Sequence, residues 1–241
     1  MRAVVWGASG AMGKLLCNLL GEQVVGRVSA DGENSSVTDA ALLGDIRPDM
    51  VIDFSHHTAA QAVCAYAVAS RCPLVIGTTG HTPEEKEIIS QAAETIPVFF
   101  SGNMSMGIAM LCKLAKQTAA AFPEADIEIL EIHHNRKVDA PSGTAKMLFE
   151  AVKTVRPEAR ANCGRAGEGR RQPGEVGISS VRMGNIVGIH EVHISTGNQT
   201  LTLRHEAYDR GMFAEGAVEA AAFLRGKQPG IYTMNDLLEA K

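Results

Sequence analysis

The densest group of polar side chains in the sequence runs from residue 131 to 145, EIHHNRKVDAPSGTA. It contains two adjacent histidines, His133 and His134, followed by Lys137. A histidine can take up or release a proton near neutral pH because its reference pKa is about 6.5, and a nearby lysine can supply a proton or stabilise negative charge. We therefore predict that His133 and Lys137 form an acid–base pair. If a strand continues through both histidines, their side chains point to opposite faces and have different roles.

The same segment has the features of a helix start that binds an anion. Pro141 suits the first helical turn, and Asp139 or Ser142 could cap the helix. The amides and hydroxyls of Ser142, Gly143 and Thr144 would then meet a carboxylate at the positive end of the helix dipole. A solvated strand end is the alternative explanation for one histidine, but the whole group favours a site.

Zinc binding is the other use of a histidine cluster. His133 and His134, taken with the distant His190 and His193, have no recognised zinc-ligand spacing. We therefore predict no metal. His56, His57, His81 and His205 are interpreted as structural or surface residues, and nucleophilic catalysis by Cys163 is a minor alternative because no histidine neighbours it in sequence.

A glycine-rich segment, GASGAMG (7–13), directly follows an apolar run and opens a helical pattern. The spacing is a G-x-x-G-x-x-G form of the dinucleotide-binding fingerprint. Gly7 permits a tight turn, Gly10 lets the backbone approach a pyrophosphate, and Gly13 allows the helix to pack closely on the sheet. The alternative is a glycine turn in an unrelated βαβ protein, but the position at the first strand favours a nucleotide site.

The residues that bind the cofactor ribose follow the second apolar run. An acidic residue about 20 positions after the glycine segment binds the ribose hydroxyls in this fold, which points to Asp31, with Glu33 less well placed. Lys14 and Arg27 lie nearby, but no arginine follows in the usual place for a 2′-phosphate. The sequence therefore does not choose between NADH and NADPH.

Two loops of small residues, GTTGHTP (77–83) and SGNMSMG (101–107), follow the fourth and fifth apolar runs. Ligands of parallel sheets bind at the carboxyl ends of the strands, and exposed amides there suit a nicotinamide ribose and carboxamide. For either loop taken alone, a tight turn is the alternative.

The elements that must position these residues change in character along the chain. Up to about residue 103, short β-branched runs alternate with helical patterns, which predicts βαβ units in a doubly wound, Rossmann-type parallel sheet. The predicted strands are 3–6, 24–30, 50–55, 74–77 and 96–100. This is an α/β fold.

A second part follows, and it combines helices with strands joined by tight turns. It has predicted helices at 105–122, capped by Ser105, and at 140–155, and predicted strands at 126–134, 176–183, 186–195 and 199–207. Gly-Asn turns at 184–185 and 197–198 predict a mixed, largely antiparallel sheet in an α+β domain. A last helix, 212–224, should return to the first domain, so we expect a dinucleotide-binding domain of 1–104 with 211–241 and a substrate and oligomerisation domain of 105–210.

The composition excludes several classes of protein. Of 241 residues, 45% are hydrophobic and 21% charged, with a net charge of -4, which does not suit nucleic-acid or membrane-surface binding. The five cysteines are an odd number with no C-x-x-C pair, which fits a reducing cytoplasm. The apolar start is too short for a signal peptide, and no apolar run could span a bilayer. For the arginine-rich loop 164–175, a lid or subunit contact is favoured over a nucleic-acid patch.

The segment EIHHNRKVDAPSGTA resembles the E-x-H-H-x-x-K-x-D-A-P-S-G-T-A signature of the 4-hydroxy-tetrahydrodipicolinate (dihydrodipicolinate) reductase family. Further motifs are similar to that family in the same order from end to end: GASGAMG (7–13), DFS (53–55), GTTG (77–80), SGNMSMG (101–107), RAGEGRRQPGEVG (165–177), VRMGNIVGIHEV (181–192) and GIYTMNDLL (230–238). The resemblance implies a two-domain homotetramer of lysine and diaminopimelate biosynthesis. Its members pass hydride from NADH or NADPH to a small cyclic dicarboxylate, with loss of water.

The resemblance also implies roles for individual residues. His133 would be the acid/base and Lys137 the proton donor, and a substrate carboxylate would be held by His134, Ser142, Gly143 and Thr144. The cofactor would be held by Gly7, Ala8, Ser9, Gly10, Ala11, Met12, Gly77, Thr78, Thr79, Ser101, Gly102, Asn103 and Met104. The tetramer would form through the sheet of the second domain.

The sequence departs from the family pattern at the ribose end of the cofactor site. The stretch 31–49 is short, and the usual acidic-then-basic pair after the second strand is represented only by Ala30-Asp31. Two rivals share parts of the pattern: another two-domain oxidoreductase, such as a semialdehyde or sugar dehydrogenase, and a non-catalytic nucleotide sensor. A sensor would have lost the histidine–lysine pair, which is intact here.

Overall fold

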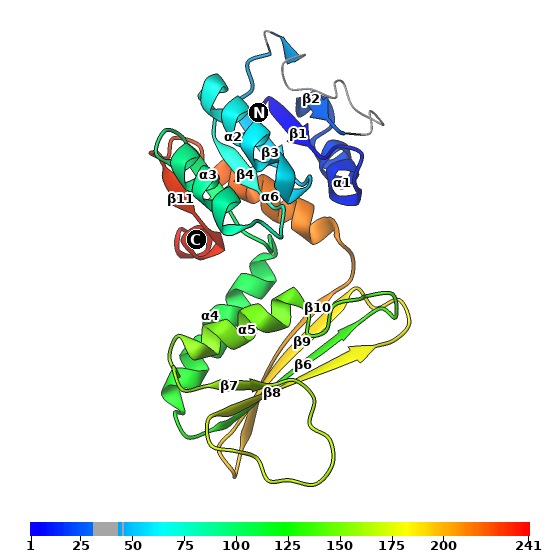
Figure 1. Ribbon diagram of the computed structural model, residues 1–241, viewed down its shortest axis with the longest axis vertical. Coiled ribbons are helices and arrows are strands. Elements are labelled where there is room, and N and C mark those ends of the chain that lie inside the picture. Colours follow the sequence, from blue (N-terminus) through cyan, green and yellow to red (C-terminus); the bar gives the residue numbers. More distant parts are fainter. Residues whose placement is uncertain (31–42, 45) are drawn as a thin grey trace. The chain divides into compact units, whose positions relative to one another are not determined.

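The computed structural model describes residues 1–30, 43–44 and 46–241. Within them the chain divides into two compact units (Figure 1). The first comprises Met1–Ser105 and Gly211–Lys241, and the second comprises Met106–Arg210. The first unit is therefore discontinuous, because the chain leaves it for the second unit and then returns.

The first unit contains a parallel sheet with the strand order β11-β5-β4-β3-β1-β2. Its strands are β1 (Ala3–Trp6), β2 (Val24–Val28), β3 (Met50–Asp53), β4 (Leu74–Ile76), β5 (Pro97–Phe100) and β11 (Gly230–Tyr232). Its helices are α1 (Ala11–Leu20), α2 (Ala60–Ser70), α3 (Pro83–Ala93), α6 (Gly211–Phe223) and α7 (Met234–Glu239), with short 3-10 turns η1 (Gly21–Gln23) and η3 (His57–Ala59). The predicted Rossmann-type parallel sheet is confirmed.

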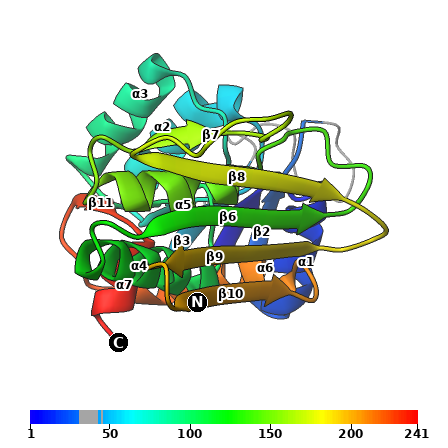
Figure 2. The same ribbon diagram turned by 90° about the horizontal axis from the view of Figure 1, so that it is seen from below.

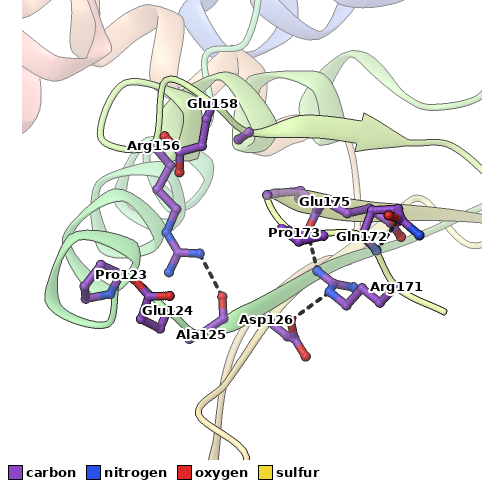
Figure 3. Close-up of a pocket in the computed structure, with 13 residues that line it drawn as sticks. Pro123, Glu124, Ala125, Asp126, Arg156, Glu158, Arg171, Gln172, Pro173 and Glu175 are labelled. Carbon is purple, nitrogen blue, oxygen red and sulfur yellow. Dashed lines mark hydrogen bonds and ion pairs between the residues drawn. The ribbon is translucent and has the colours of Figure 1, made fainter.

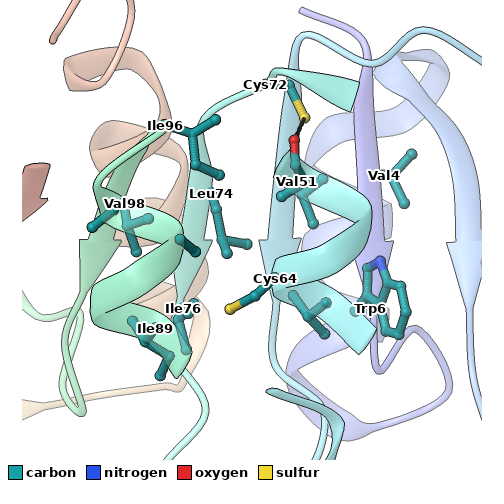
Figure 4. Packing of buried hydrophobic residues seen from close by; sticks show 14 of the residues in the cluster. Val4, Trp6, Val51, Cys64, Cys72, Leu74, Ile76, Ile89, Ile96 and Val98 are labelled. Atoms are coloured by element: carbon teal, nitrogen blue, oxygen red, sulfur yellow. Dashed lines mark hydrogen bonds between the residues drawn. The ribbon is translucent and has the colours of Figure 1, made fainter. Parts of the chain in front are cut away.

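The apolar runs are continuous because helices cover both faces of this sheet. Strands β1, β3 and β4 are buried at every position. On one face, Val4 and Trp6 of β1 pack in a cluster with Val51, Leu74 and residues of α2 and α3 (Figure 4). Helices α1 and α6 pack together on the other side. The sheet is thus a rigid support for the loops at its carboxyl edge.

The order of the strands sets the position of a ligand crevice in the first unit. Strand β1 lies between β2 and β3, so the chain leaves β1 in one direction and later returns to its other side. In open parallel sheets this reversal separates the flanking loops and opens a ligand crevice at the carboxyl ends of the strands. The glycine-rich segment after β1 lies at this place.

The second unit contains a five-stranded sheet, counted over the described residues, with the order β10-β9-β6-β8-β7. Its strands are β6 (Asp126–His133), β7 (Arg160–Asn162), β8 (Glu175–Arg182), β9 (Gly188–Ser195) and β10 (Thr200–Ala207), and its helices are α4 (Met106–Ala121) and α5 (Gly143–Lys153). Both helices pack on one face of the sheet, where they share a core with alternate residues of β6, β8 and β9 (Figure 2).

The strand pairing corrects one expectation. The sheet is mixed, but β8 pairs in parallel with both β6 and β7, and only the β6–β9 and β9–β10 pairs are antiparallel. The Gly184-Asn185 turn therefore does not close a hairpin, because β6 lies between the two strands that the turn connects. The mixed sheet is confirmed, but the pairing of β8 could not be predicted, because residue spacing in β8 and β9 does not reveal an inserted strand.

Some element ends also differ from the predicted ones. Strand β6 ends at His133, so the alternation argued for the two histidines does not extend to His134. Helix α5 begins at Gly143 with Ser142 as its N-cap, and Pro141 precedes the helix instead of lying in its first turn. Strand β7, just before the arginine-rich loop, was not among the predicted strands, because it is a short, largely exposed strand at the sheet edge and has no apolar pattern. None of the helices in the described ranges is long and apolar enough to cross a membrane.

Candidate active site

Strand β6 carries a hydrogen-bonded histidine–carboxylate pair at its carboxyl end. Glu131 and His133 are two residues apart and therefore share a face of the strand, the face that α4 and α5 cover. His133 Nδ1 lies 2.6 Å from Glu131 Oε2. Glu131 is fully buried and His133 is 9% exposed, so the pair lies at the boundary between core and solvent.

Glu131 accepts hydrogen bonds from several further groups, including the side chain of Ser180. Arg182, in register with His133 on β8, donates from Nη1 and Nη2 to the two carboxylate oxygens at 2.8 and 2.7 Å. The backbone amide of Ser142 donates to Oε1 at 3.1 Å. Burial alone would raise the pKa of Glu131, but these hydrogen bonds hold that pKa well below its usual range. The carboxylate is therefore ionised at any pH near neutrality.

Ser142 ties the same cluster to the start of α5. Its Oγ accepts the Ala145 amide at 3.2 Å, as an N-cap does, and lies 3.2 Å from His190 Nε2 on β9. The side chain of Ser142 is buried and its amide is used by Glu131. The sequence assigned Ser142 to substrate binding, and in the structure its amide and hydroxyl contact groups of the chain itself.

Gly143, the first residue of α5, faces open space. A Cβ built on Gly143 has no heavy atom within 4 Å, and the residue is exposed. The first amides of a helix have no carbonyl one turn earlier to accept them, and the helix dipole makes this end attractive to an anion. Thr144 follows at the second helical position and is half-buried. This helix start, next to the His133–Glu131 pair, is open and can accept an anion.

Lys137 and His134 lie in the loop that joins β6 to α5. Lys137 Nζ is 2.7 Å from Asp139 Oδ1, and this hydrogen bond lowers the pKa of Asp139. Burial and the nearby cations Arg136 and Arg210 lower the pKa of His134, which keeps its ring neutral. His134 Nδ1 is buried without a hydrogen-bond partner in the described part of the chain. The loop thus contributes the ammonium of Lys137, which is paired with Asp139, and the imidazole of His134, whose pKa is lowered.

A separate cavity of about 420 Å³ lies in the first unit, at the reversal of strand order. The loops after β1, β2 and β3 line it through Trp6, Gly7, Ser9, Gly10, Val28, Ser29, Ala30, Phe54, Ser55, His56, Thr58 and Ala59. His56 and Thr58 line this cavity but belong to none of the predicted cofactor motifs. The sequence could have indicated them through their position directly after a strand of the parallel sheet.

The glycines of the first loop fit a bound pyrophosphate. Gly7 has a φ of 76°, and a Cβ there would lie 2.3 Å from the Phe54 carbonyl oxygen. A Cβ on Gly13 would lie 2.0 Å from the Gly7 carbonyl oxygen, so α1 packs directly on the loop. Gly10, the N-cap of α1, lines the cavity and makes no side-chain cap hydrogen bond, so α1 begins at the cavity wall, where a helix start can accept phosphate oxygens.

The loops after β4 and β5 are joined to each other and to β3. Thr78 Oγ1 donates to buried Asp53 at 2.7 Å, and the Ser55 amide donates to the same carboxylate at 3.0 Å. Burial raises the pKa of Asp53. The Ser101 amide, just after β5, donates to the carbonyl oxygen of Ile76, the last residue of β4, at 3.1 Å. These contacts fix the two loops at the carboxyl edge of the sheet.

The remaining predicted cofactor residues differ in exposure. Gly10, Ala11, Thr79 and Gly102 are exposed, whereas the side chains of Ala8, Thr78, Asn103 and Met104 are buried. Gly7, Ser9, Met12, Gly77 and Ser101 are intermediate. Met104 packs in the core, where its carbonyl oxygen would be 1.8 Å from a Cβ on Gly216. The predicted ribose ligand Asp31, and the alternative Glu33, lie outside the described residues.

Another cavity, of about 510 Å³, lies at the opposite end of β6 (Figure 3). The two arginines that line this cavity bind other groups of the chain. Arg156 donates to the carbonyl oxygens of Ala119, Phe122 and Ala125, which end α4. Arg171, from the loop predicted as a lid or subunit contact, pairs with Asp126 and Glu128 on β6.

Sequence reasoning missed Glu131, Arg182 and His190 as parts of the candidate site. Glu131 could have been found, because an i, i+2 pair on a strand shares one face. Arg182 and His190 could not, because their approach to His133 depends on the order β9-β6-β8. Among the described residues no group of three or more His, Cys, Asp or Glu side chains is placed to hold a metal ion.

The chain matches family models along nearly its whole length. Residues 1–104 match the model described as dihydrodipicolinate reductase, N-terminus, and residues 107–238 match dihydrodipicolinate reductase, C-terminus. Two curated relatives are named 4-hydroxy-tetrahydrodipicolinate reductase. The protein of Alkaliphilus oremlandii is 43% identical over 99% of this chain and 98% of its own length, and that of Caulobacter vibrioides is 40% identical over 100% and 98%.

Solved structures agree at the level of the fold. A dipicolinate-bound dihydrodipicolinate reductase from Paenisporosarcina sp. TG-14 superposes with a TM-score of 0.80 at 24% identity, covering 98% of both chains. A diaminopimelate dehydrogenase from C. glutamicum gives 0.56 at 13% identity, covering 100% of this chain and 96% of that one. The matches to both family models and the full-length identities above 40% show that this chain belongs to the dihydrodipicolinate reductase family.

Proposed function

We propose that the protein reduces 4-hydroxy-tetrahydrodipicolinate to tetrahydrodipicolinate, a step of lysine and diaminopimelate biosynthesis, with NADH or NADPH as hydride donor. The observation that carries the proposal is the arrangement at the carboxyl end of β6. There an acid–base pair and an open helix start are joined through one carboxylate. Family membership and the names of the relatives support the same reaction.

The substrate is a cyclic dicarboxylate, and the second unit offers groups for its carboxylates. The exposed amide of Gly143 and the following residue, Thr144, would hold one carboxylate at the positive end of α5. His134, with its unpartnered Nδ1, and Lys137 would contact the substrate beside it. Such fixed contacts orient the ring, and orientation supplies a large part of an enzyme's rate enhancement.

The reaction needs one hydride and one proton, and it releases water. The bound nicotinamide supplies the hydride. His133 and Lys137 handle the proton: His133 Nε2 exchanges it with the substrate, and the ammonium of Lys137 stabilises negative charge that develops on the ring or donates a proton itself. The balance is then complete, because hydride and proton together reduce the double bond that loss of water leaves.

The cofactor would lie at the crevice of the first unit. Gly7 to Met12 and the start of α1 would hold the pyrophosphate, and the loops Gly77–Thr79 and Ser101–Met104 would contact the nicotinamide end. Buried Thr78 and Met104 would act through their backbone, since their side chains pack against the protein.

We further propose a homotetramer formed through the sheet face that α4 and α5 leave uncovered. Ile132 of β6, Val181 of β8 and Ile189 of β9 lie on that face in register with one another, and Leu130 lies on the same face two residues earlier in β6. They form an apolar patch on an otherwise polar face, as is typical of subunit contacts.

The test is a coupled absorbance assay with purified protein. The preceding synthase generates the substrate in place from pyruvate and aspartate semialdehyde, and NADH or NADPH is supplied in separate cuvettes. Wild-type protein should oxidise the nucleotide only when the synthase is present, and the two rates rank the cofactors. His133→Gln should lower turnover by about 100-fold with unchanged nucleotide affinity.

Two results would contradict the proposal. Nucleotide binding without substrate-dependent oxidation favours a sensor or another dehydrogenase. Full turnover of His133→Gln removes His133 from the acid–base role.

A further inference from the structure

The carboxylate of Glu131 contacts both halves of the candidate substrate site. It accepts from the ring of His133 at 2.6 Å and from the amide of Ser142 at 3.1 Å. The first contact fixes the acid–base group, and the second fixes the residue before the open start of α5. A single side chain, buried at 0% exposure, therefore holds the two in one arrangement.

Arg182 keeps this carboxylate ionised and in place. Its bidentate contact with Glu131 is the strongest kind of ion pair that a protein offers. Arg182 is itself held by the carbonyl oxygens of Asp139 at 2.6 Å and Val181 at 2.8 Å. The carboxylate oxygens thus cannot rotate without losing several hydrogen bonds.

An ionised carboxylate can only accept hydrogen bonds, so the bond to His133 requires a hydrogen on Nδ1. The other ring nitrogen, Nε2, then carries a lone pair in the neutral ring and a proton in the charged ring. It points along the side of β9, where a Cβ built on Gly188 would lie 3.1 Å away. The absence of a side chain at Gly188 leaves room beside the reactive nitrogen.

The charged and titratable groups around His133 come from several elements. Glu131 is on its own strand, Arg182 is on β8, and His190 is on β9 with its ring centroid 5.1 Å away in an edge-to-face arrangement. Burial lowers the pKa of His190 to about 3, so its ring is neutral. The loop adds Lys137 paired with Asp139. Within this described cluster, Glu131 is the anion in direct contact with the His133 ring.

We propose that Glu131 is a positioning residue that fixes the His133 ring with its hydrogen on Nδ1, and so presents Nε2 for proton exchange with the substrate. This inference rests on the proposed function, because it names the group that directs His133 in that reaction. Glu131 touches neither substrate nor cofactor and acts through His133 and Ser142.

The isosteric variant Glu131→Gln separates this role from packing. Its amide oxygen can keep the contacts of Oε1 with Ser142 and Arg182 Nη2, while its amide nitrogen takes the place of Oε2 beside His133 and loses the hydrogen bond from Arg182 Nη1. That nitrogen donates, so His133 must accept at Nδ1 and carry its hydrogen on Nε2 in the neutral ring. Glu131→Asp keeps the negative charge on a side chain that is one methylene group shorter.

The first readout is the histidine tautomer, observed through two-bond nitrogen–proton correlations of protein labelled with ¹⁵N-histidine. The His133 signals are assigned by their loss in His133→Gln. The expected result is hydrogen on Nδ1 in wild type and in Glu131→Asp, and hydrogen on Nε2 in Glu131→Gln. Hydrogen on Nε2 in the wild-type neutral ring overturns the proposal without recourse to any variant.

The second readout is the pH dependence of kcat and kcat/KM in the coupled assay. Glu131→Gln should lose at least about tenfold in kcat, because Nε2 of the neutral ring then carries the hydrogen, and its kcat/KM profile should differ from that of wild type because the negative charge beside His133 is lost. Glu131→Asp should recover part of kcat and the wild-type profile. Glu150→Gln, an exposed residue of α5, should match wild type.

The outcomes are distinguishable from failure of the proposed function. If wild type does not turn over the substrate, the function fails, while the tautomer spectra still decide whether Glu131 fixes the ring. If wild type is active and Glu131→Gln loses kcat with neither tautomer nor pH profile changed, the role is only structural and the proposal is wrong.

Discussion

At the level of single residues, the predicted candidate groups differ in how they are used. His133 and Lys137 lie at the carboxyl end of β6 with ionic partners, Glu131 and Asp139. Ser142, in contrast, is an N-cap whose amide and hydroxyl contact the chain. Residue type and spacing predicted a candidate site, but partners on other strands could not be predicted, because i, i+2 relations hold only within one strand.

Gly143→Ala tests the anion site at the start of α5. The added Cβ meets no heavy atom of the chain within 4 Å, so stability should not fall, but the methyl group would occupy space in front of the amide that binds the substrate carboxylate. We expect KM for the substrate to rise by about tenfold, roughly the worth of one displaced hydrogen bond to a charged group.

The measurement is steady-state kinetics, with thermal unfolding and nucleotide affinity as internal controls. An unchanged KM would remove the helix start from substrate binding. A lowered melting temperature would mean that the substitution acts on the fold instead.

At the level of elements, the parallel sheet was predictable through its central strands, which are buried on both faces and read as continuous apolar runs. The partly exposed edge strand β11 was not predicted. The second sheet was less predictable. Strand β6 separates β8 from β9, and no pattern in either of those strands records the insertion. Strand β7 was missed because its three residues are mostly exposed.

Gly7→Ala tests the loop between β1 and α1. Gly7 has a positive φ, and a Cβ would lie 2.3 Å from the Phe54 carbonyl oxygen, so the loop must shift. Nucleotide affinity should fall by at least about tenfold, since the amides at the start of α1 would no longer point into the cavity.

Gly21→Ala is the matched control. Gly21 also has a positive φ, 53°, but a Cβ there has no neighbour within 4 Å. It should cost about 1 kcal/mol of stability from backbone strain and leave nucleotide affinity unchanged. Equal losses of affinity in both variants would show that Gly7 has no special role in the cofactor site.

At the level of the whole molecule, the two units divide the task. One carries the crevice of a parallel sheet, and the other carries an acid–base pair with an anion site. The family model for the C-terminus extends to residue 238, although the chain after Arg210 folds with the first unit. The C-terminal family model and the second compact unit therefore end at different residues.

The ion pair inside the second unit should make its stability depend on acid. The pKa of Glu131 is lowered in the folded protein, so its contribution is fully present above the unfolded value of 4.5 and is lost as pH falls toward the lower, folded value. Wild type should therefore exceed Glu131→Gln in stability by about 3 kcal/mol near neutral pH, and the difference should shrink below the unfolded pKa.

Hydrogen-exchange protection of the β6 amides, measured across this pH range, reports the second unit directly. Glu128→Gln is the control, because Glu128 lies on the same strand with a side chain 43% exposed. If the difference in protection between wild type and Glu131→Gln stays constant with pH, the proposed link between Glu131 ionisation and stability is wrong.

The most direct test of the central claim follows the transferred hydrogen itself. The wild-type protein is given substrate formed in place and NADH or NADPH deuterated at nicotinamide C4, and the product is analysed by mass spectrometry. The account predicts that each tetrahydrodipicolinate molecule gains one deuterium from the nucleotide. Nucleotide binding with no deuterium in that product would contradict it.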